Sequence, residues 1–267
     1  MTGNNRKNGR RRGLNLQPRD HTLLSEVGIM RVAHRDHLRV AAGFHSTTRV
    51  NARLLALTRE RLLRRFFIAS GVGQKALYAL SPKGGQLVHL PARGPRRPQD
   101  KLLVADFFVI HQLAVNDLYC DLKFGDSLPE DAQFVNWIAF FEPITPAVAL
   151  IPDGYVEVRH HGKTVAAFLE VDLGHERLAV WTAKAKHYVE LAVSGAFEKH
   201  FRQPRFRVLV IVNSKRRLQS IRATVAHTTE KLFWFATQDD VRGEKFTGPV
   251  WLRPEGDDYQ PLFESLS

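Results

Sequence analysis

The stretch LIPDGYVEVRHHGKTVAAFLEVDLGHERLAVWTAKAKHY, residues 150–188, decides the fold of the C-terminal part of the chain. Alternating apolar residues on both sides of the HHGK segment predict two antiparallel strands joined by a tight turn. If the turn is centred on His161 and Gly162, Asp153 faces Glu170 across the hairpin. A two-residue and a four-residue loop both give this register, whereas a three-residue loop with a bulge would break it.

The alternation also divides this hairpin into two faces. One face is expected to be core and carries Val156, Val158, Val165, Ala167, Leu169 and Val171. The other face is expected to form a functional site and carries Asp153, Tyr155, Glu157, Glu170 and Asp172.

Carboxylates that face one another on a sheet repel, so this arrangement needs a compensating charge. Mg²⁺ or Mn²⁺, held by one or two carboxylates plus waters, would supply it. The predicted metal ligands are therefore Asp153, Glu170 and Asp172. A solvated acidic edge with raised pKa values is the alternative interpretation.

A helix predicted over residues 175–197 places Lys184 and Tyr188 on one face, because they are four residues apart. Lys184 would stabilise negative charge developing on a phosphate, while the metal lowers the pKa of its bound water. Lys186 points to another side of the helix and is the weaker candidate. The nearby histidines lack the spacing of a histidine metal site and are expected at the surface: His160, His161, His175 and His187.

Apolar periodicity predicts that the hairpin belongs to a mixed central sheet flanked by helices, an α/β layer fold. The expected order is a helix at 100–122, a strand at 132–142, the hairpin and its helix, a strand at 205–213, a helix at 214–230 and a strand at 231–237.

Positive charge is confined to the first third of the chain. Residues 1–99 carry 20 Lys and Arg against 4 Asp and Glu, a balance of +16, and the remainder carries 19 against 23, a balance of −4. Such polarisation indicates a polyanion-binding module beside a second module. The predicted parts are a disordered basic tail at 1–14, a DNA-binding domain at 15–90, a proline-rich linker at 91–99 and a second domain at 100–267.

The first domain has the order of a winged helix-turn-helix. A helix at 19–32, a short helix ending at Gly43 and a helix capped by Ser46 precede two strands around a glycine turn. The third helix would enter the DNA major groove. Predicted base-contacting residues are Ser46, Thr47, Thr48, Arg49, Asn51 and Arg53. Predicted phosphate-contacting residues are Arg64, Arg65, Gln74 and Lys75, with Arg10, Arg11 and Arg12 in a minor-groove arm.

Two alternatives remain for this domain: solvated arginines on a three-helix unit, or a protein-docking winged helix. Other classes find little support in the sequence. Its one cysteine cannot form an internal disulfide, and no apolar run is long enough to cross a membrane. We therefore expect a cytoplasmic protein without a membrane partner. Nothing has the spacing of a phosphate-binding P-loop.

Several motifs together resemble the replication-relaxation family of plasmids and mobile elements: HQLAVNDLY at 111–119, PD at 152–153, FLEVDLG at 168–174 and KAKHY at 184–188. The PD and EVD pair also resembles the PD-(D/E)xK superfamily of metal-dependent nucleases. The resemblance implies a winged helix followed by a nuclease-like domain, with a role in plasmid replication and DNA relaxation. Double-stranded DNA is the expected partner, with a relaxase, a replication protein or a second copy of the chain as further candidates.

The chain departs from the nuclease pattern at one position. Asp172 stands where that pattern has lysine, and Lys184 on the following helix is the obvious substitute. The expected catalytic set is Asp153, Glu170, Asp172 and Lys184. Two hypotheses follow: a Mg²⁺- or Mn²⁺-dependent nicking endonuclease, or a DNA-binding adaptor with an inactive nuclease-like domain that recruits a relaxase or replicase.

Overall fold

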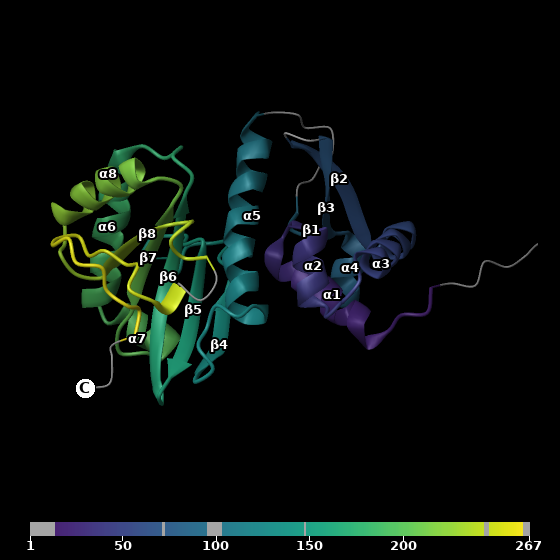
Figure 1. The fold of residues 1–267 in the computed structure, drawn as a ribbon, viewed down its shortest axis with the longest axis horizontal. Coiled ribbons are helices and arrows are strands. Elements are labelled where there is room, and N and C mark those ends of the chain that lie inside the picture. Colours follow the sequence, from purple (N-terminus) through teal and green to yellow (C-terminus); the bar gives the residue numbers. More distant parts are fainter. Residues whose placement is uncertain (1–13, 71–72, 95–102, 147, 243–245, 264–267) are drawn as a thin grey trace, which may run out of the picture. The chain divides into compact units, whose positions relative to one another are not determined.

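The computed structural model describes residues 14–70, 73–94, 103–146, 148–242 and 246–263 (Figure 1). The chain divides into two compact units, residues 1–105 and residues 106–267. We call them the first and the second unit and describe each by itself.

The first unit combines helices with a three-stranded antiparallel sheet of order β1-β3-β2. Its elements are α1 (Pro18–Met30), β1 (Ala33–His34), α2 (Arg35–Ala41), α3 (Thr47–Arg59), β2 (Leu63–Ser70), β3 (Gly73–Leu80) and α4 (Pro82–Leu87). The predicted cap at Ser46 is confirmed, because its hydroxyl accepts a hydrogen bond from the backbone N–H of Arg49 at 3.4 Å. Gly43, with a φ of +62°, follows α2 as expected. The two-residue strand β1 is too short to be recognised in the sequence.

The second unit is built on a five-stranded mixed sheet of order β4-β5-β6-β7-β8 (Figure 1). Strands β4, β5 and β6 are antiparallel neighbours, and β7 and β8 continue the sheet in parallel with β6. The predicted mixed α/β sheet is thus confirmed. The elements are α5 (Leu103–Phe124), β4 (Ala132–Ile138), β5 (Gly154–His160), β6 (Lys163–Asp172), α6 (Leu178–Val193), α7 (Ala196–Phe201), β7 (Arg207–Val212), α8 (Lys215–Ala226) and β8 (Phe233–Thr237).

The hairpin of β5 and β6 has the predicted register, with Gly154 opposite Leu169. Its turn is the two-residue form: His161 and Gly162 both have positive φ, 47° and 74°. Asp153 lies one residue before β5, and its backbone N–H donates to the carbonyl of Leu169 at 3.2 Å. The hairpin therefore brings Asp153 beside the end of β6 that carries Glu170.

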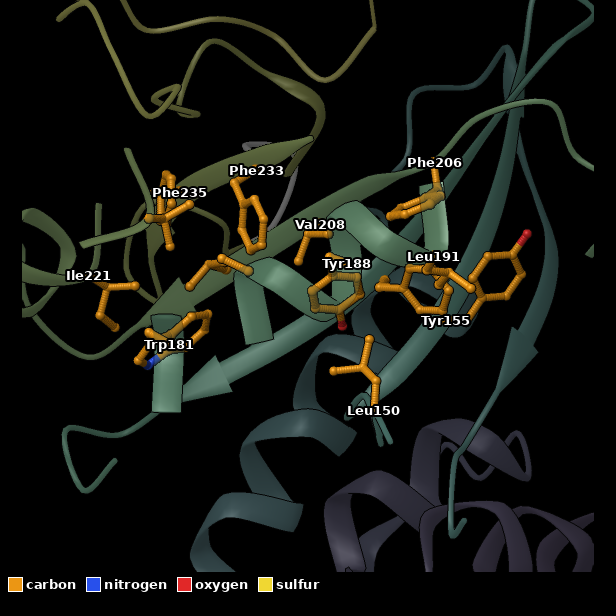
Figure 2. Packing of buried hydrophobic residues seen from close by; sticks show 14 of the residues in the cluster. Leu150, Tyr155, Trp181, Tyr188, Leu191, Phe206, Val208, Ile221, Phe233 and Phe235 are labelled. Atoms are coloured by element: carbon orange, nitrogen blue, oxygen red, sulfur yellow. The ribbon is translucent and has the colours of Figure 1, made fainter. Parts of the chain in front are cut away.

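The expectation that only one face of the hairpin is core was wrong. The valine-rich face packs with residues of α5 and of the C-terminal segment, as predicted. The opposite face is also buried, because Tyr155 and Phe168 pack against side chains from α6, α7 and α8. Figure 2 shows Trp181 and Tyr188 of α6 within this second core. Glu170 is 0% exposed, so any chemistry of this carboxylate takes place at the edge of a packed interior.

The helix predicted over 175–197 is interrupted. Gly195, with a φ of +73°, separates α6 from α7. Phe197 and Phe201 of α7 belong to the same core and pack against the ring of Tyr155. In the part of the chain that the structure describes, no helix has the length and apolar character needed to cross a membrane.

Candidate functional site

Glu170 of β6 holds two side chains from α6. Its Oε1 accepts a hydrogen bond from the Tyr188 hydroxyl at 2.6 Å, and its Oε2 accepts one from Lys184 Nζ at 2.9 Å. Lys184 and Tyr188 lie one helical turn apart and reach the same carboxylate, as their spacing predicts. The side chain of Lys184 is 18% exposed, so this cluster reaches the surface through its lysine.

The charges of Glu170 and Lys184 shift each other's pKa values. Burial raises the pKa of Glu170 to about 7, although Lys184 and the Tyr188 hydroxyl oppose the rise. Burial alone would lower the pKa of Lys184, but the charges of Glu170, Glu176 and Asp153 outweigh burial and raise this pKa. Lys184 therefore stays protonated at neutral pH, beside a carboxyl group that titrates near neutrality.

Glu176 is a further acid of this cluster that the sequence did not single out. Both of its oxygens lie 3.0 Å from Lys184 Nζ. Glu176 precedes α6, so the helical spacing that links Lys184 to Tyr188 does not extend to it. Lys184 also stands over the Trp181 ring, 4.9 Å from its centroid. One lysine thus connects a buried carboxylate with a partly exposed one.

Asp153 is anchored by backbone and by α5. Its Oδ2 accepts a hydrogen bond from the Val171 N–H at 2.7 Å and lies 3.1 Å from His111 Nε2. The same Nε2 lies 2.9 Å from the carbonyl oxygen of Val171. Because both neighbours are acceptors, Nε2 of His111 carries the proton. The side chain of Asp153 is 20% exposed.

His111 opens the HQLAVNDLY motif, but nothing in the sequence identified it as the partner of Asp153. Burial lowers its pKa, yet the hydrogen bond and the charge of Asp153 outweigh burial, and the pKa is raised. The nearby charge of Lys184 opposes this rise. His111, Asp153, Glu170 and Lys184 therefore form one electrostatic cluster, which we call the Asp153–Lys184 cluster.

Asp172 does not join this cluster. Its Oδ1 accepts hydrogen bonds from Gly174 N–H at 2.5 Å and Arg217 Nε at 3.1 Å. Its Oδ2 accepts them from Trp181 Nε1 at 2.8 Å and Arg217 Nη2 at 2.6 Å. Burial raises the pKa of Asp172, but these bonds outweigh burial and the pKa is lowered. Asp172 is the buried half of an ion pair with α8.

The expected three-carboxylate metal site is therefore not assembled. Among the described residues, the oxygens of Asp153, Glu170 and Asp172 do not gather within 4.8 Å of one another. Asp172 is instead paired with the guanidinium of Arg217, which is 45 residues away in the sequence. Asp153 and Glu170 remain as the two carboxylates that influence each other.

Some of the predicted DNA-contacting residues of the first unit are exposed, and others are engaged in contacts within the unit. Exposed side chains at the start of α3 and on the hairpin are Thr47, Thr48, Arg49, Asn51, Arg65 and Lys75. Ser46 is the helix cap. The side chain of Gln74 and residues Arg10, Arg11 and Arg12 lie outside the described residues.

Arg53 and Arg64 are engaged within the unit. Arg53 Nε donates to Asp20 Oδ1 at 2.5 Å and Arg53 Nη2 to the carbonyl of Asn15 at 2.9 Å, while a second contact joins its guanidinium to Asp20. Asp20 is 1% exposed. Arg64 Nε donates to the carbonyl of Leu80 at 3.1 Å, and burial lowers its pKa. Both arginines are thus engaged in contacts within the unit, and their contacts with DNA stay predictions.

The fold and the Asp153–Lys184 cluster define a two-unit protein: a helical unit with a small antiparallel sheet, followed by a mixed α/β unit with a coupled carboxylate–lysine site. The replication-relaxation family model matches residues 20–203, which is more than half of the chain. The chain belongs to the replication-relaxation family, and this membership points to replication and relaxation of mobile elements. Comparisons with curated proteins and with solved structures give no match.

Proposed function

We propose that this protein binds double-stranded DNA of a plasmid or mobile element through its first unit and nicks it at a Mg²⁺ or Mn²⁺ site in its second unit. Membership of the replication-relaxation family supports a role in the replication and relaxation of mobile-element DNA. The observation that carries the chemistry is the 2.9 Å contact between Lys184 Nζ and Glu170 Oε2. Lys184 of α6 would take the place of the lysine that the nuclease pattern has where this chain has Asp172.

The strand order supports a PD-(D/E)xK assignment of the second unit. Asp153 precedes β5, Glu170 lies in the antiparallel neighbour β6, and α6 follows. Strand β7 then pairs in parallel with β6. This is the order of acid, acid, helix and apolar strand on which the resemblance rests. The helices and hairpin of the first unit support a winged helix in the same way.

The carboxylate oxygens of Asp153 and Glu170 are ligands of the kind that a hard divalent cation prefers. Such an ion takes one or two carboxylates and keeps several waters. Among the described residues, no donor reaches Asp153 Oδ1, and each Glu170 oxygen accepts a single hydrogen bond. When bound, the ion would lower the pKa of its water and polarise a phosphoryl oxygen.

The chain's own residues have separate tasks in this proposal. Lys184, held positive by three carboxylates, stabilises negative charge on the phosphate. Tyr188 fixes the orientation of Glu170 through its 2.6 Å hydrogen bond. His111 fixes Asp153 through the proton on Nε2, which leaves the other oxygen of the carboxylate toward the site.

One observation favours the adaptor hypothesis instead. Each oxygen of Glu170 already accepts a hydrogen bond from Lys184 or Tyr188, and Asp172, at the position where the nuclease pattern has lysine, is paired with Arg217. A scaffold stabilised in this way needs no metal. It would bind DNA and recruit a relaxase, a replicase or a second copy of the chain.

Metal-dependent nicking separates the two functions. We expect supercoiled plasmid carrying the element's own origin region to be converted to the open-circular form with Mg²⁺ or Mn²⁺ and to remain intact with EDTA. Gel electrophoresis measures the conversion, and a gel shift in EDTA measures binding. Intact plasmid under all metal conditions, together with a retained gel shift, would rule out the endonuclease and establish the adaptor.

Two arginines of α3 test DNA recognition by the first unit. Arg49→Ala is expected to weaken binding to the specific site by about 1–3 kcal/mol, because an exposed arginine at the start of this helix can reach guanine. Arg53→Ala is expected to lower the unit's stability by about 2–3 kcal/mol, because it leaves the Asp20 carboxylate buried and unpaired. Gel shifts measure the first effect, and hydrogen exchange of α1 and α3 measures the second.

The two substitutions serve as controls for each other. Arg49→Ala should change stability by less than about 0.5 kcal/mol. Arg59→Ala, at the far end of α3, is the matched variant for DNA contact, since Arg59 is also exposed. Equal loss of binding with Arg49→Ala and Arg59→Ala would contradict base recognition at the start of the helix.

A further inference from the structure

A second group of ligating side chains lies at the other end of the hairpin. Asp131 Oδ2 is 2.8 Å from His161 Nε2 and 3.1 Å from His160 Nε2. All three ligating atoms lie within 4.8 Å of one another. The side chains of Asp131 and His161 are 47% and 41% exposed, and that of His160 is 18% exposed. Two imidazoles and a carboxylate thus converge at an accessible position.

Strand pairing builds this group. Ala132 of β4 is paired with His160 of β5, which places Asp131 next to the hairpin turn. His161 occupies the first turn position with a φ of +47°, a conformation that non-glycine residues seldom adopt. The tight turn places the imidazole of His161 beside the carboxylate of Asp131. The ring of His160 is held by stacking on Phe263, with centroids 4.4 Å apart.

We propose that Asp131, His160 and His161 form a binding site for a zinc-class transition metal ion. Zinc takes nitrogen and oxygen ligands at about 2.0–2.2 Å in a tetrahedron, which separates neighbouring ligand atoms by about 3.3 Å. The 2.8 and 3.1 Å spacings seen here need to open by only a few tenths of an ångström. Imidazole suits zinc, copper and nickel, whereas Mg²⁺ prefers oxygen ligands.

Three protein ligands leave the fourth zinc position open, the arrangement of sites at which zinc binds a water or a substrate. His160 and His161 line a cavity of about 780 Å³ at the amino ends of β6, β7 and β8. Five cationic side chains line the same cavity: Lys163, Arg205, Arg207, Lys231 and Arg253. No carboxylate is among the described residues that line it. The ligand class for the open position is therefore a phosphate or phosphate ester.

This site is independent of the proposed nicking site. Asp153 precedes β5 and His160 ends it, and a seven-residue strand spans roughly 20 Å. The two sites also differ in metal preference. Failure of Mg²⁺-dependent nicking would leave the zinc proposal intact, and failure of zinc binding would leave the nicking proposal intact.

Calorimetric titration of the full chain with Zn²⁺ tests the site. We expect one equivalent to bind to the wild type. Asp131→Ala and His161→Ala should each weaken binding by more than the 10–100-fold that loss of an outer hydrogen-bond partner costs. His200→Ala is the matched control, because His200 is an exposed histidine away from this group. Asp131→Asn keeps the side-chain shape and separates loss of a ligand from loss of structure.

Co²⁺ provides the second readout. Tetrahedral coordination should give intense visible absorption bands in the wild type, and inorganic phosphate should alter them. An unchanged spectrum with phosphate would overturn the assignment of the ligand class. Equal Zn²⁺ affinity for the His200→Ala protein and an Asp131→Ala/His161→Ala double variant would mean an adventitious ion only and would overturn the site.

Discussion

Asp172→Ala is expected to lower the free energy of unfolding of the second unit by about 3–5 kcal/mol, the cost of breaking a buried ion pair from one side. Asp172 is 1% exposed and accepts four hydrogen bonds. Its removal leaves the indole N–H of Trp181 without its acceptor and leaves the guanidinium of Arg217 with the carbonyl of Glu176 but no carboxylate. Unpaired polar groups in a packed interior carry the full desolvation cost.

Tryptophan fluorescence during urea unfolding measures this loss, because all four tryptophans lie in the second unit. Asp239→Ala is the control: the Asp239 side chain is 88% exposed, and its loss should change stability by less than about 0.5 kcal/mol. A change below about 1 kcal/mol in Asp172→Ala would contradict a structural role for this carboxylate.

The pH dependence of the Asp172 contribution follows from its lowered pKa. A carboxyl group with a lowered folded-state pKa stabilises the protein above its unfolded pKa, which is about 3.9 for aspartate. That stability is lost as the pH falls through the folded-state pKa. The stability difference between the wild type and Asp172→Asn should therefore be full at pH 7 and should shrink in acid.

Local patterns in the sequence were enough to predict the hairpin, its register and the shared face of Lys184 and Tyr188. Each of these depends on residues a few positions apart or on one tight turn. The partners of the acids could not be predicted in this way. His111 is 42 residues from Asp153, and Arg217 is 45 residues from Asp172. Alternation shows that two faces exist, but it does not show that α6, α7 and α8 cover the second.

The histidines at the turn illustrate the same limit. The spacing of these histidines in the sequence does not match two metal ligands on one helix turn, so no metal site was expected there. The group with Asp131 forms because β4 pairs with β5. Knowing that Ala132 is paired with His160 would have been enough to place Asp131 beside the two histidines. The signal that was missed is a pair of successive histidines at a two-residue turn, opposite an acid that precedes the neighbouring strand.

Glu170 and Asp172 are two residues apart on the same face of β6, yet their environments drive their pKa values in opposite directions. Glu170 is fully buried and its pKa is raised to about 7, whereas the pKa of Asp172 is lowered chiefly by Arg217. Two carboxyl groups whose pKa values differ in this way can take different roles. Asp172 stays ionised and structural, and Glu170 can change its protonation near neutral pH.

Lys184→Ala is accordingly expected to reduce metal-dependent nicking by about 10²–10³-fold, the typical cost of removing one donor that stabilises transition-state charge. Lys186→Ala is the matched control, because Lys186 is exposed on the same helix and should nick like the wild type. Asp153→Ala, which removes an expected metal ligand, should be at least as defective. Plasmid conversion rates under saturating Mn²⁺ measure all three variants.

A pH profile separates catalysis from a purely structural role of Lys184. Because Glu170 must be ionised to hold a cation, the wild-type nicking rate should rise with pH through about 7. Lys184 lowers the pKa of Glu170 against the effect of burial, so in Lys184→Ala the rise should move to higher pH. Lys184→Arg keeps the positive charge and should keep the wild-type profile. A rate that Lys184→Ala lowers equally at every pH, in step with lost stability, would show that Lys184 only supports the fold.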